Sequence, residues 1–195
     1  HTPFQWAAMD SLSEVARTAY LNPLALAPGM EPGLTATKAY DPPPMTYSNA
    51  THACAVEVDP GTGAPRILRY VVVEDAGTVI NPMVVDGQIL GAAAMAISGT
   101  LLEHVVYTPD GQNLTGTFMD YLLATASEVP EIEIEHIHTA NPRTPLGLKG
   151  MAEGGVMGAV AAVAGAVQDA LGHLGVTANR LPLSPGAILT LLPQA

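Results

Sequence analysis

Residues 51–76, THACAVEVDPGTGAPRILRYVVVEDA, decide the fold of this chain. In 51–58, side chains alternate between two faces, which is typical of a half-buried strand. One of those faces is formed by His52, Cys54, Val56 and Val58. Segment 59–63, DPGTG, has the proline and glycines of a tight turn, and 67–73 is apolar apart from Arg69. The stretch therefore predicts a β-hairpin whose second strand is covered on both faces.

A helix rich in glycine and alanine is predicted directly after the hairpin. Asn81 is a good N-cap, and Pro82 suits the first helical position because its missing N–H would be unpaired there anyway. The helix is expected to run to about Glu103. It should bury one stripe, formed by Met83, Leu90, Ile97 and Leu101. Gly87 and Gly91 suggest that another element closely approaches its backbone.

Two further elements complete the predicted fold. Strict alternation at 131–138 predicts a third strand, and a second long apolar helix is expected from about Gly155 to Leu174. Polar side chains in its last turns favour a buried helix over a membrane span. The prediction is an α+β fold in two layers, a mixed β-sheet covered by two long Gly/Ala-rich helices. Residues 1–45, a short helix and a proline-rich extended segment, should precede the main domain at 46–195.

The composition narrows the classes of function. The 195 residues include 7 Lys and Arg against 18 Asp and Glu, a net charge of −11. This argues against nucleic-acid partners and against membrane insertion or binding to anionic membranes. One cysteine, Cys54, excludes a disulfide scaffold or an iron–sulfur cluster within the chain. No signal peptide is visible, so a cytoplasmic location is expected.

The scarcity of charge has two interpretations. Charged residues make up 13% of the chain, against roughly a quarter to a third of the surface of small domains. An ordinary protein rich in alanine and glycine is one explanation. The other is that much of the surface faces another chain or another part of a longer polypeptide.

The main candidate for chemistry is LKGMAEGG at 148–155, directly before the second helix. A glycine-flanked loop that opens a helix presents free N–H groups and suits an anion. Glu153, held there among small apolar residues, would be poorly solvated, which suits a general base, although Lys149 would favour its charged form. The alternative is that Glu153 merely caps the helix and interacts with its dipole.

Two weaker candidates remain. Gln88, beside Gly87 in the first helix, can donate and accept hydrogen bonds to a planar ligand; the alternative is a slender helix with Gln88 at its surface. His136 and His138 share one face of a strand, with His52 a conceivable third ligand. A histidine metal site is therefore an alternative to core or interface histidines.

Several short stretches occur in a fixed order along the chain. They are VEVDP at 56–60 with TG at 62–63, EDAG at 74–77, INP at 80–82, GQI at 87–89, LGLKGMAE at 146–153 and VQDAL at 167–171. Together they resemble the molybdenum hydroxylases, the family of xanthine dehydrogenase, aldehyde oxidase and aerobic carbon monoxide dehydrogenase. The resemblance covers roughly 30–192 and is to the C-terminal, molybdopterin-binding part of the large subunit. MEPGL at 30–34 with YDPP at 40–43 is most similar to the carbon monoxide dehydrogenase branch.

The resemblance implies roles for individual residues. In the family, the glutamate of the K-G-x-x-E motif lies beside the molybdenum and acts as general base, and the matching residue is Glu153. The glutamine of the G-Q motif hydrogen-bonds the cofactor region, which implies that role for Gln88 with Gly87. The backbone that would line the pterin is that of Lys149, Gly150, Met151 and Ala152. The dithiolene of the cofactor holds the metal, so no protein metal ligand is expected.

The resemblance also implies a function and partners. This chain would supply the base and part of the cofactor wall for oxidative hydroxylation with water as oxygen source, or for carbon monoxide oxidation. The cofactor is molybdenum–molybdopterin, of which the cytosine dinucleotide form is one option, shared with upstream segments. The partners are the rest of the subunit, iron–sulfur and flavin (FAD) subunits and a small-molecule substrate. The chain alone is expected to be inactive.

Two departures from the family pattern favour an alternative. Met95 stands where many relatives have a second glutamine, and GMA at 150–152 replaces the usual Gly-x-Gly. The upstream cofactor-binding segments are also absent from these 195 residues. The alternative is a non-catalytic assembly domain of the same fold that binds no cofactor.

Overall fold

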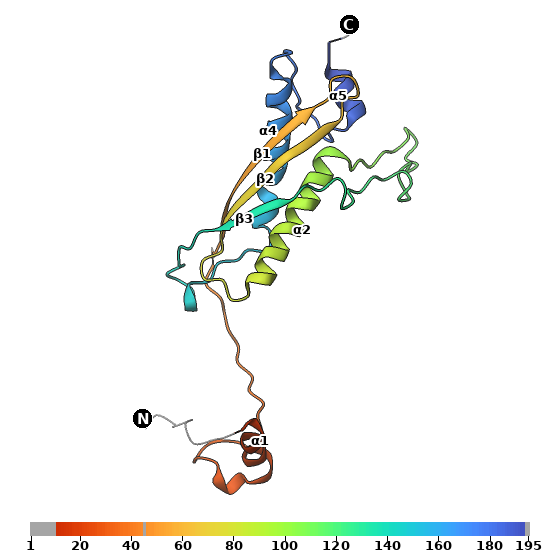
Figure 1. Cartoon of the computed structure of the whole chain (residues 1–195). Helices are drawn as coiled ribbons and strands as arrows, with labels where there is room; N and C mark the ends of the chain where they lie inside the picture. Colours follow the sequence, from red (N-terminus) through yellow and green to blue (C-terminus); the bar gives the residue numbers. More distant parts are fainter. Residues whose placement is uncertain (1–10, 45, 194–195) are drawn as a thin grey trace. The chain divides into compact units, whose positions relative to one another are not determined.

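The computed structural model describes residues 11–44 and 46–193, which fall into two compact units, His1–Pro42 and Pro43–Ala195. The first unit contains helix α1 (Leu12–Leu21) and a 3-10 turn, η2 (Pro23–Ala25) (Figure 1). Helix α1 is capped by the side chain of Ser11, which accepts a hydrogen bond from the amide of Glu14. A capped first turn satisfies one of the amides that a helix start leaves unpaired.

The second unit is built on a mixed sheet, whose described strands lie in the order β1-β2-β3. Their bounds are β1 (Asn49–Val58), β2 (Pro65–Asp75) and β3 (Ile132–His136). Strands β1 and β2 are antiparallel with Cys54 opposite Tyr70, and β3 runs parallel to β2 with Ile134 opposite Val72. The predicted hairpin, the third strand and the mixed sheet are therefore confirmed. The expectation that the second hairpin strand is covered on both faces is wrong for this chain, because the outer face of β2 is open and Leu68 there is 53% exposed.

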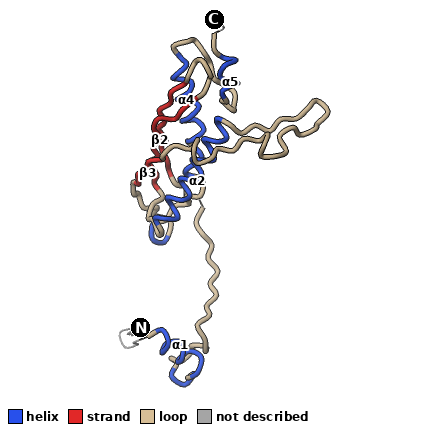
Figure 2. The backbone as a smooth tube through the Cα atoms, turned by 45° about the vertical axis from the view of Figure 1, so that its right-hand side comes forward, coloured by secondary structure: helices blue, strands red, loops and turns tan. Residues whose placement is uncertain are grey.

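Helices cover one face of this sheet (Figures 1 and 2). They are α2 (Pro82–Leu101), α3 (Gly154–Met157) and α4 (Ala159–Gly172). Helix α5 (Pro185–Leu191) lies beside the hairpin turn, where Gly63 approaches Pro185 and Leu189, and a 3-10 turn, η3 (Pro145–Gly147), precedes the loop at 148–153. Helix α4 packs against β1, while α2 packs against α3, α4 and β3. The core between the layers includes Tyr70, Val72, Ile89, Ile97, Val163 and Val167. This is the predicted two-layer α+β architecture.

The predicted apolar stripe on α2 is wrong in its first half. Ile97 and Leu101 are buried, but Met83 and Leu90 are 76% and 42% exposed. The residues of α2 that face the core are mostly small, and they include Val85, Ile89, Ala93 and Ala96. Small side chains such as Ala93 and Ala96 let α2 lie close to its neighbours, and of the predicted stripe only Met83 and Leu90 face outward.

The glycines of α2 do not mark the close approach that was predicted. A Cβ on Gly87 or Gly91 would meet nothing within 4 Å. The contact is made instead by Gly155 of α3, where a Cβ would lie 2.8 Å from Ile89 Cα and 2.9 Å from Ala92 Cβ. The glycine that allows α2 and α3 to approach each other closely is therefore Gly155 of α3, and not a glycine of α2.

The second long helix is interrupted near its start. Helix α3 ends at Met157 and α4 begins at Ala159, with Gly158 between them. A Cβ on Gly158 would lie 2.5 Å from the ring atom Cδ2 of His52. The imidazole from β1 therefore occupies the space beside the break.

By length and composition alone, Pro82–Leu101 and Gly154–Gly172 are apolar enough to cross a membrane. In this fold α2 and α4 bury side chains in the same core as β2. That burial is typical of core helices in a globular domain.

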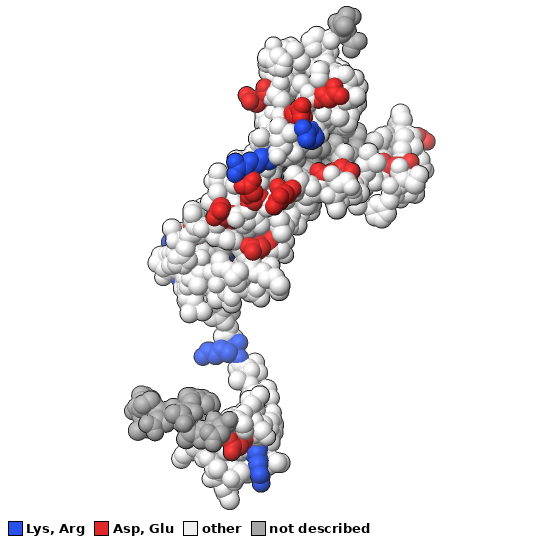
Figure 3. Space-filling view, in the orientation of Figure 1, with Lys and Arg blue, Asp and Glu red and all other residues white. Residues whose placement is uncertain are grey.

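The visible outer face of the sheet carries acidic side chains with few basic ones among them (Figure 3). Exposed ion pairs on this face join Arg66 to Glu57 at 2.6 Å and Arg69 to Glu133 at 2.7 Å. The acidic face agrees with the net charge of −11.

Candidate functional site

The loop at 148–153 is hydrogen-bonded to two neighbouring segments. The amide of Lys149 donates to the carbonyl of Ala76 at 3.1 Å, just beyond the end of β2. The amide of Gly150 donates to the carbonyl of Thr46, and the amide of Ser48 donates back to the carbonyl of Gly150 at 3.0 Å. The start of the loop is therefore held between the segment at 46–48 and the residue that follows β2.

The side chain of Lys149 points into the protein. Its Nζ lies 2.8 Å from Asp75 Oδ2 and 2.7 Å from Thr139 Oγ1, and the Lys149 and Asp75 side chains are only 10% and 4% exposed. Burial alone would raise the pKa of Asp75, but hydrogen bonds from Lys149, Thr139 and Gly77 hold it well below its ordinary value. Since the Lys149 amide and Nζ are both engaged within the chain, the carbonyl group and the aliphatic part of the side chain are what remain available to a ligand.

The loop then passes a cavity of about 240 Å³. Its lining includes Leu148, Lys149 and Met151 from the loop and Val84 and Val85 from α2. Within the described part of the chain, the amides of 151–153 donate no hydrogen bond. Met151 lines the cavity, and three consecutive free donors that begin at this residue suit an acceptor-rich ligand.

Glu153 is exposed, which corrects the expectation that small apolar neighbours would bury it. It stands at the N-cap position of α3, but its side chain makes no capping hydrogen bond. The capping alternative is therefore also unsupported. The carboxylate is free at the surface of this chain.

The packing of α3 brings this glutamate toward α2. Gly155 touches Ile89 of α2, and Gln88 is the residue next to Ile89. Both Gln88 and Glu153 are exposed, as is Gly87. The structure thus places Gln88 and Glu153 on contacting segments, although they lie far apart along the chain.

Two side chains meet at Gly154 in a way that the sequence did not predict: Glu74, which was given no role, and His52, which was considered only as a metal ligand. Glu74 of β2 is fully buried, and its carboxylate oxygens have no hydrogen-bond partner among the described residues. Desolvation raises the pKa of Glu74, and the nearby Ser48 side chain opposes this rise only in part, since it makes no well-aligned hydrogen bond to the carboxylate. A Cβ on Gly154 would lie 2.7 Å from Glu74 Oε2. The only sequence signal was the EDAG stretch at 74–77, which gave Glu74 no role of its own.

The second side chain is His52 of β1. Its Nε2 lies 3.2 Å from the carbonyl oxygen of Gly154, and its Nδ1 lies 3.0 Å from the hydroxyl of Tyr70. A carbonyl only accepts, so Nε2 carries the hydrogen and Nδ1 accepts from Tyr70. Burial lowers the pKa of His52, outweighing the opposite effect of the Gly154 hydrogen bond. The neutral imidazole is therefore favoured.

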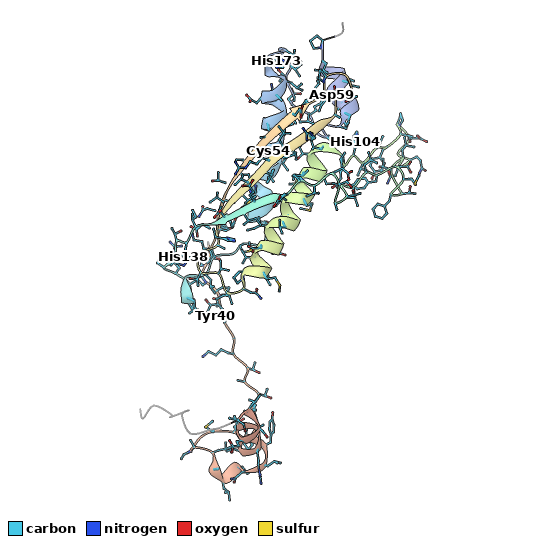
Figure 4. All side chains as sticks on the ribbon, in the orientation of Figure 1. Tyr40, Cys54, Asp59, His104, His138 and His173 are labelled. Carbon is cyan, nitrogen blue, oxygen red and sulfur yellow. The ribbon has the colours of Figure 1, made fainter. Side chains whose placement is uncertain are left out.

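The histidines do not assemble a metal site. His136 pairs with Asp86 at 2.8 Å, and His138 lies 3.2 Å from the Thr78 hydroxyl. Figure 4 places His138 at the end of the second unit opposite the hairpin turn at Asp59. No group of three or more His, Cys, Asp or Glu able to hold a metal occurs within 11–44 and 46–193. The histidine metal hypothesis is therefore unsupported.

Known proteins are similar to this chain in sequence and in fold. The carbon monoxide dehydrogenase large chain of Hydrogenophaga pseudoflava is 38% identical over 172 residues, covering 88% of this chain and 21% of that protein. The nicotine 6-hydroxylase large subunit of Paenarthrobacter nicotinovorans is 40% identical over 179 residues, covering 92% and 22%. Quinoline 2-oxidoreductase from Pseudomonas putida 86 superposes with a TM-score of 0.82 at 44% identity, covering 93% and 23%. The chain thus spans about a fifth of the length of these proteins.

The fold and the sequence similarity define a class: domains from the large subunits of molybdenum hydroxylases. Residues 3–130 match the family described as molybdopterin cofactor-binding domain. The chain belongs to this family.

Proposed function

We propose that this chain forms one wall of a molybdopterin site and that Glu153 is the general base there. The observation that supports this most directly is the contact of Gly155 with Ile89, which brings the Glu153 segment against the Gln88 segment. The same two residues match the family's base and cofactor-binding glutamine. The contact between their two segments, made by Gly155 and Ile89, is an observation separate from that match.

The residues present fit such a cofactor. Met151, the first of three residues whose amides are free to donate, lines a cavity of about 240 Å³ together with Lys149. Backbone N–H groups are suitable donors to the polar edges and phosphate of a pterin. When bound, molybdenum–molybdopterin supplies a two-electron oxidation in which water provides the oxygen atom.

The chain's own residues would then position and move a proton. Glu153 accepts a proton at its carboxylate, and Gln88 donates or accepts a hydrogen bond to the cofactor. The Lys149 side chain fixes the loop through Asp75 and leaves the backbone of 150–152 to line the pterin. The desolvation that strengthens a base must come from the remaining four-fifths of the subunit, since Glu153 is exposed here.

The exposed apolar side chains of α2 support one partner, the rest of the large subunit. Met83, Leu90 and Met95 are exposed along α2, and we infer that the rest of the subunit covers them. We further infer iron–sulfur and FAD subunits as electron acceptors, the cytosine dinucleotide form of the cofactor and a cytoplasmic location. The substrate is a small molecule of the kind the relatives' names give: carbon monoxide, nicotine or quinoline.

The test is Glu153→Gln in the full-length subunit, purified with its partners. The matched control is Glu135→Gln, an exposed glutamate on β3. Molybdenum is measured by mass spectrometry, and turnover of carbon monoxide, nicotine and quinoline is followed with an electron-accepting dye. We expect unchanged molybdenum and a loss of roughly 10²- to 10⁴-fold in turnover for Glu153→Gln only.

Two results would contradict the proposal. Near-normal turnover by Glu153→Gln removes this residue from the chemistry. A wild-type complex that contains the chain but no molybdenum favours the alternative, a non-catalytic assembly domain.

A further inference from the structure

Gly154, the residue after Glu153, is held from two sides by the sheet. From β1, His52 Nε2 donates to the Gly154 carbonyl at 3.2 Å. From β2, the buried Glu74 carboxylate occupies the space that a side chain at position 154 would need. No other amino acid fits here without displacing the carboxylate.

The hydrogen-bond chain has a fixed direction. The Tyr70 hydroxyl donates to His52 Nδ1, and His52 Nε2 donates to Gly154. Tyr70 is fully buried, and its ring packs edge-on to the imidazole with centroids 6.0 Å apart. His52 is therefore held in one orientation before it reaches the loop.

The burial of the Glu74 carboxyl group in the core lowers the stability of the fold. An unpartnered carboxyl group away from water destabilises a fold, whereas an apolar side chain of similar size would not. Costly buried groups concentrate where a protein acts rather than where it is merely packed. The position of Glu74 directly behind Gly154 gives it such a place.

We propose that His52 and Glu74 are positioning residues, which fix the backbone at Gly154 and thereby set the direction of the Glu153 side chain. The inference rests on the proposed function of Glu153. Neither residue touches the cofactor or substrate in this role. Their effect is on geometry, and a misplacement of about 1 Å at a reacting group can cost roughly 100-fold in rate.

The first test is a matched pair of variants in the full-length complex. His52→Gln places an amide nitrogen near the position of Nε2 and keeps the donor to Gly154. His52→Asn places its amide group near Nδ1, where the amide oxygen can accept from Tyr70, and so keeps only the Tyr70 contact. With the substrate that the wild-type complex turns over, we expect His52→Asn to lower kcat roughly 10- to 100-fold with KM and molybdenum content unchanged. His52→Gln should stay within about threefold of wild type.

A second readout needs no turnover. The amides of Val156 and Met157 donate to the carbonyl of Glu153 at 3.1 and 3.3 Å. Hydrogen exchange at these amides in the full chain should be roughly tenfold faster in His52→Asn than in wild type, and near wild type in His52→Gln. Equal exchange in the two variants would overturn the positioning role of His52.

The role of Glu74 is tested by introducing a steric clash at position 154 and then removing the Glu74 side chain that causes it. Gly154→Ala should lower kcat because its Cβ collides with the Glu74 carboxylate. Adding Glu74→Ala opens that space, so the double variant should recover at least tenfold relative to Gly154→Ala alone. Additive losses would show that the two residues act independently and would overturn the role of Glu74.

These outcomes separate the inference from the function on which it rests. An active Glu153→Gln complex overturns both. An inactive Glu153→Gln complex, combined with equal kcat in His52→Asn and His52→Gln, overturns the positioning role alone.

Discussion

Replacing Lys149 by methionine should destabilise the chain far more than the same change at Arg66. Both side chains form short ion pairs, Lys149 with Asp75 at 2.8 Å and Arg66 with Glu57 at 2.6 Å. The first pair is 10% and 4% exposed, and the second is 73% and 58% exposed. The two substitutions therefore compare burial at nearly constant geometry.

The magnitudes follow from that burial. At an effective dielectric constant of about 20, unit charges 2.8 Å apart attract by about 6 kcal/mol, and desolvation offsets part of this. In Lys149→Met the Asp75 carboxylate keeps its bonds from Gly77 and Thr139 but loses its counter-ion. Removing one partner of a buried pair costs about 3–5 kcal/mol. The solvated Arg66 pair should contribute less than about 1 kcal/mol.

The pH dependence gives an independent check. The pKa of Asp75 is lower in the folded chain than in the unfolded one. Its contribution is therefore present above the unfolded pKa of about 3.9 and is lost as the pH falls below that value. Without Lys149 the folded pKa rises, so the stability difference between wild type and Lys149→Met should shrink from pH 7 to pH 3.

The assay is urea unfolding of the purified chain, followed by circular dichroism at both pH values. The double variant Asp75→Asn with Lys149→Met removes the stranded charge and should recover part of the loss. Equal costs at Lys149 and Arg66, or a Lys149 cost unchanged at pH 3, would refute the reasoning.

Three further predictions use the same chain. Burial raises the pKa of Cys54 to about 11, so alkylation by iodoacetamide at pH 8 should be roughly 100-fold slower than in urea; equal rates would contradict its burial. The lowered pKa of His52 means that its contribution is present above the unfolded value of about 6.5 and is lost as pH falls below it. The slope of unfolding free energy from pH 6.5 to 5 should therefore flatten in His52→Gln, and an unchanged slope would count against this. Gly63→Ala should cost about 1–3 kcal/mol in urea unfolding, because φ is +70° and a Cβ would lie 2.8 Å from Leu189 Cγ. Gly186→Ala, with nothing within 4 Å, should be neutral or slightly stabilising, and similar costs at both glycines would refute the steric argument.

Local patterns predicted those parts of the fold that neighbouring residues determine. Asn81 caps α2 by accepting from the amide of Val84, and the hairpin and β3 lie within two residues of their expected bounds. The stripe on α2 failed because periodicity identifies a face but not its partner. The close neighbours of α2 include α3, whose Gly155 meets Ile89 and Ala92; small residues such as Ala93 and Ala96 lie buried on the inner face, and Met83 stays outside.

The candidate site shows the same division between local and distant causes. The loop before α3 and Glu153 within it were predicted from a short motif. The exposure of Glu153 depends on segments around the loop, and this chain provides only some of them. Glu74 and Lys149 were quoted within motifs, but burial of Glu74 and pairing of Lys149 with Asp75 arise only when separate segments pack together.

The glycines that follow Glu153 are sites of close packing, although their sequence suggests a flexible loop. A run of glycines before a helix is typical of a flexible loop, yet Gly154, Gly155 and Gly158 each face an occupied space. A side chain at these positions would collide with Glu74, with Ile89 or with His52, respectively. Close packing on three sides restricts a backbone more than its sequence implies. The segment is accordingly a rigid support, and the exposed carboxylate of Glu153 projects from a backbone whose position β1, β2 and α2 jointly determine.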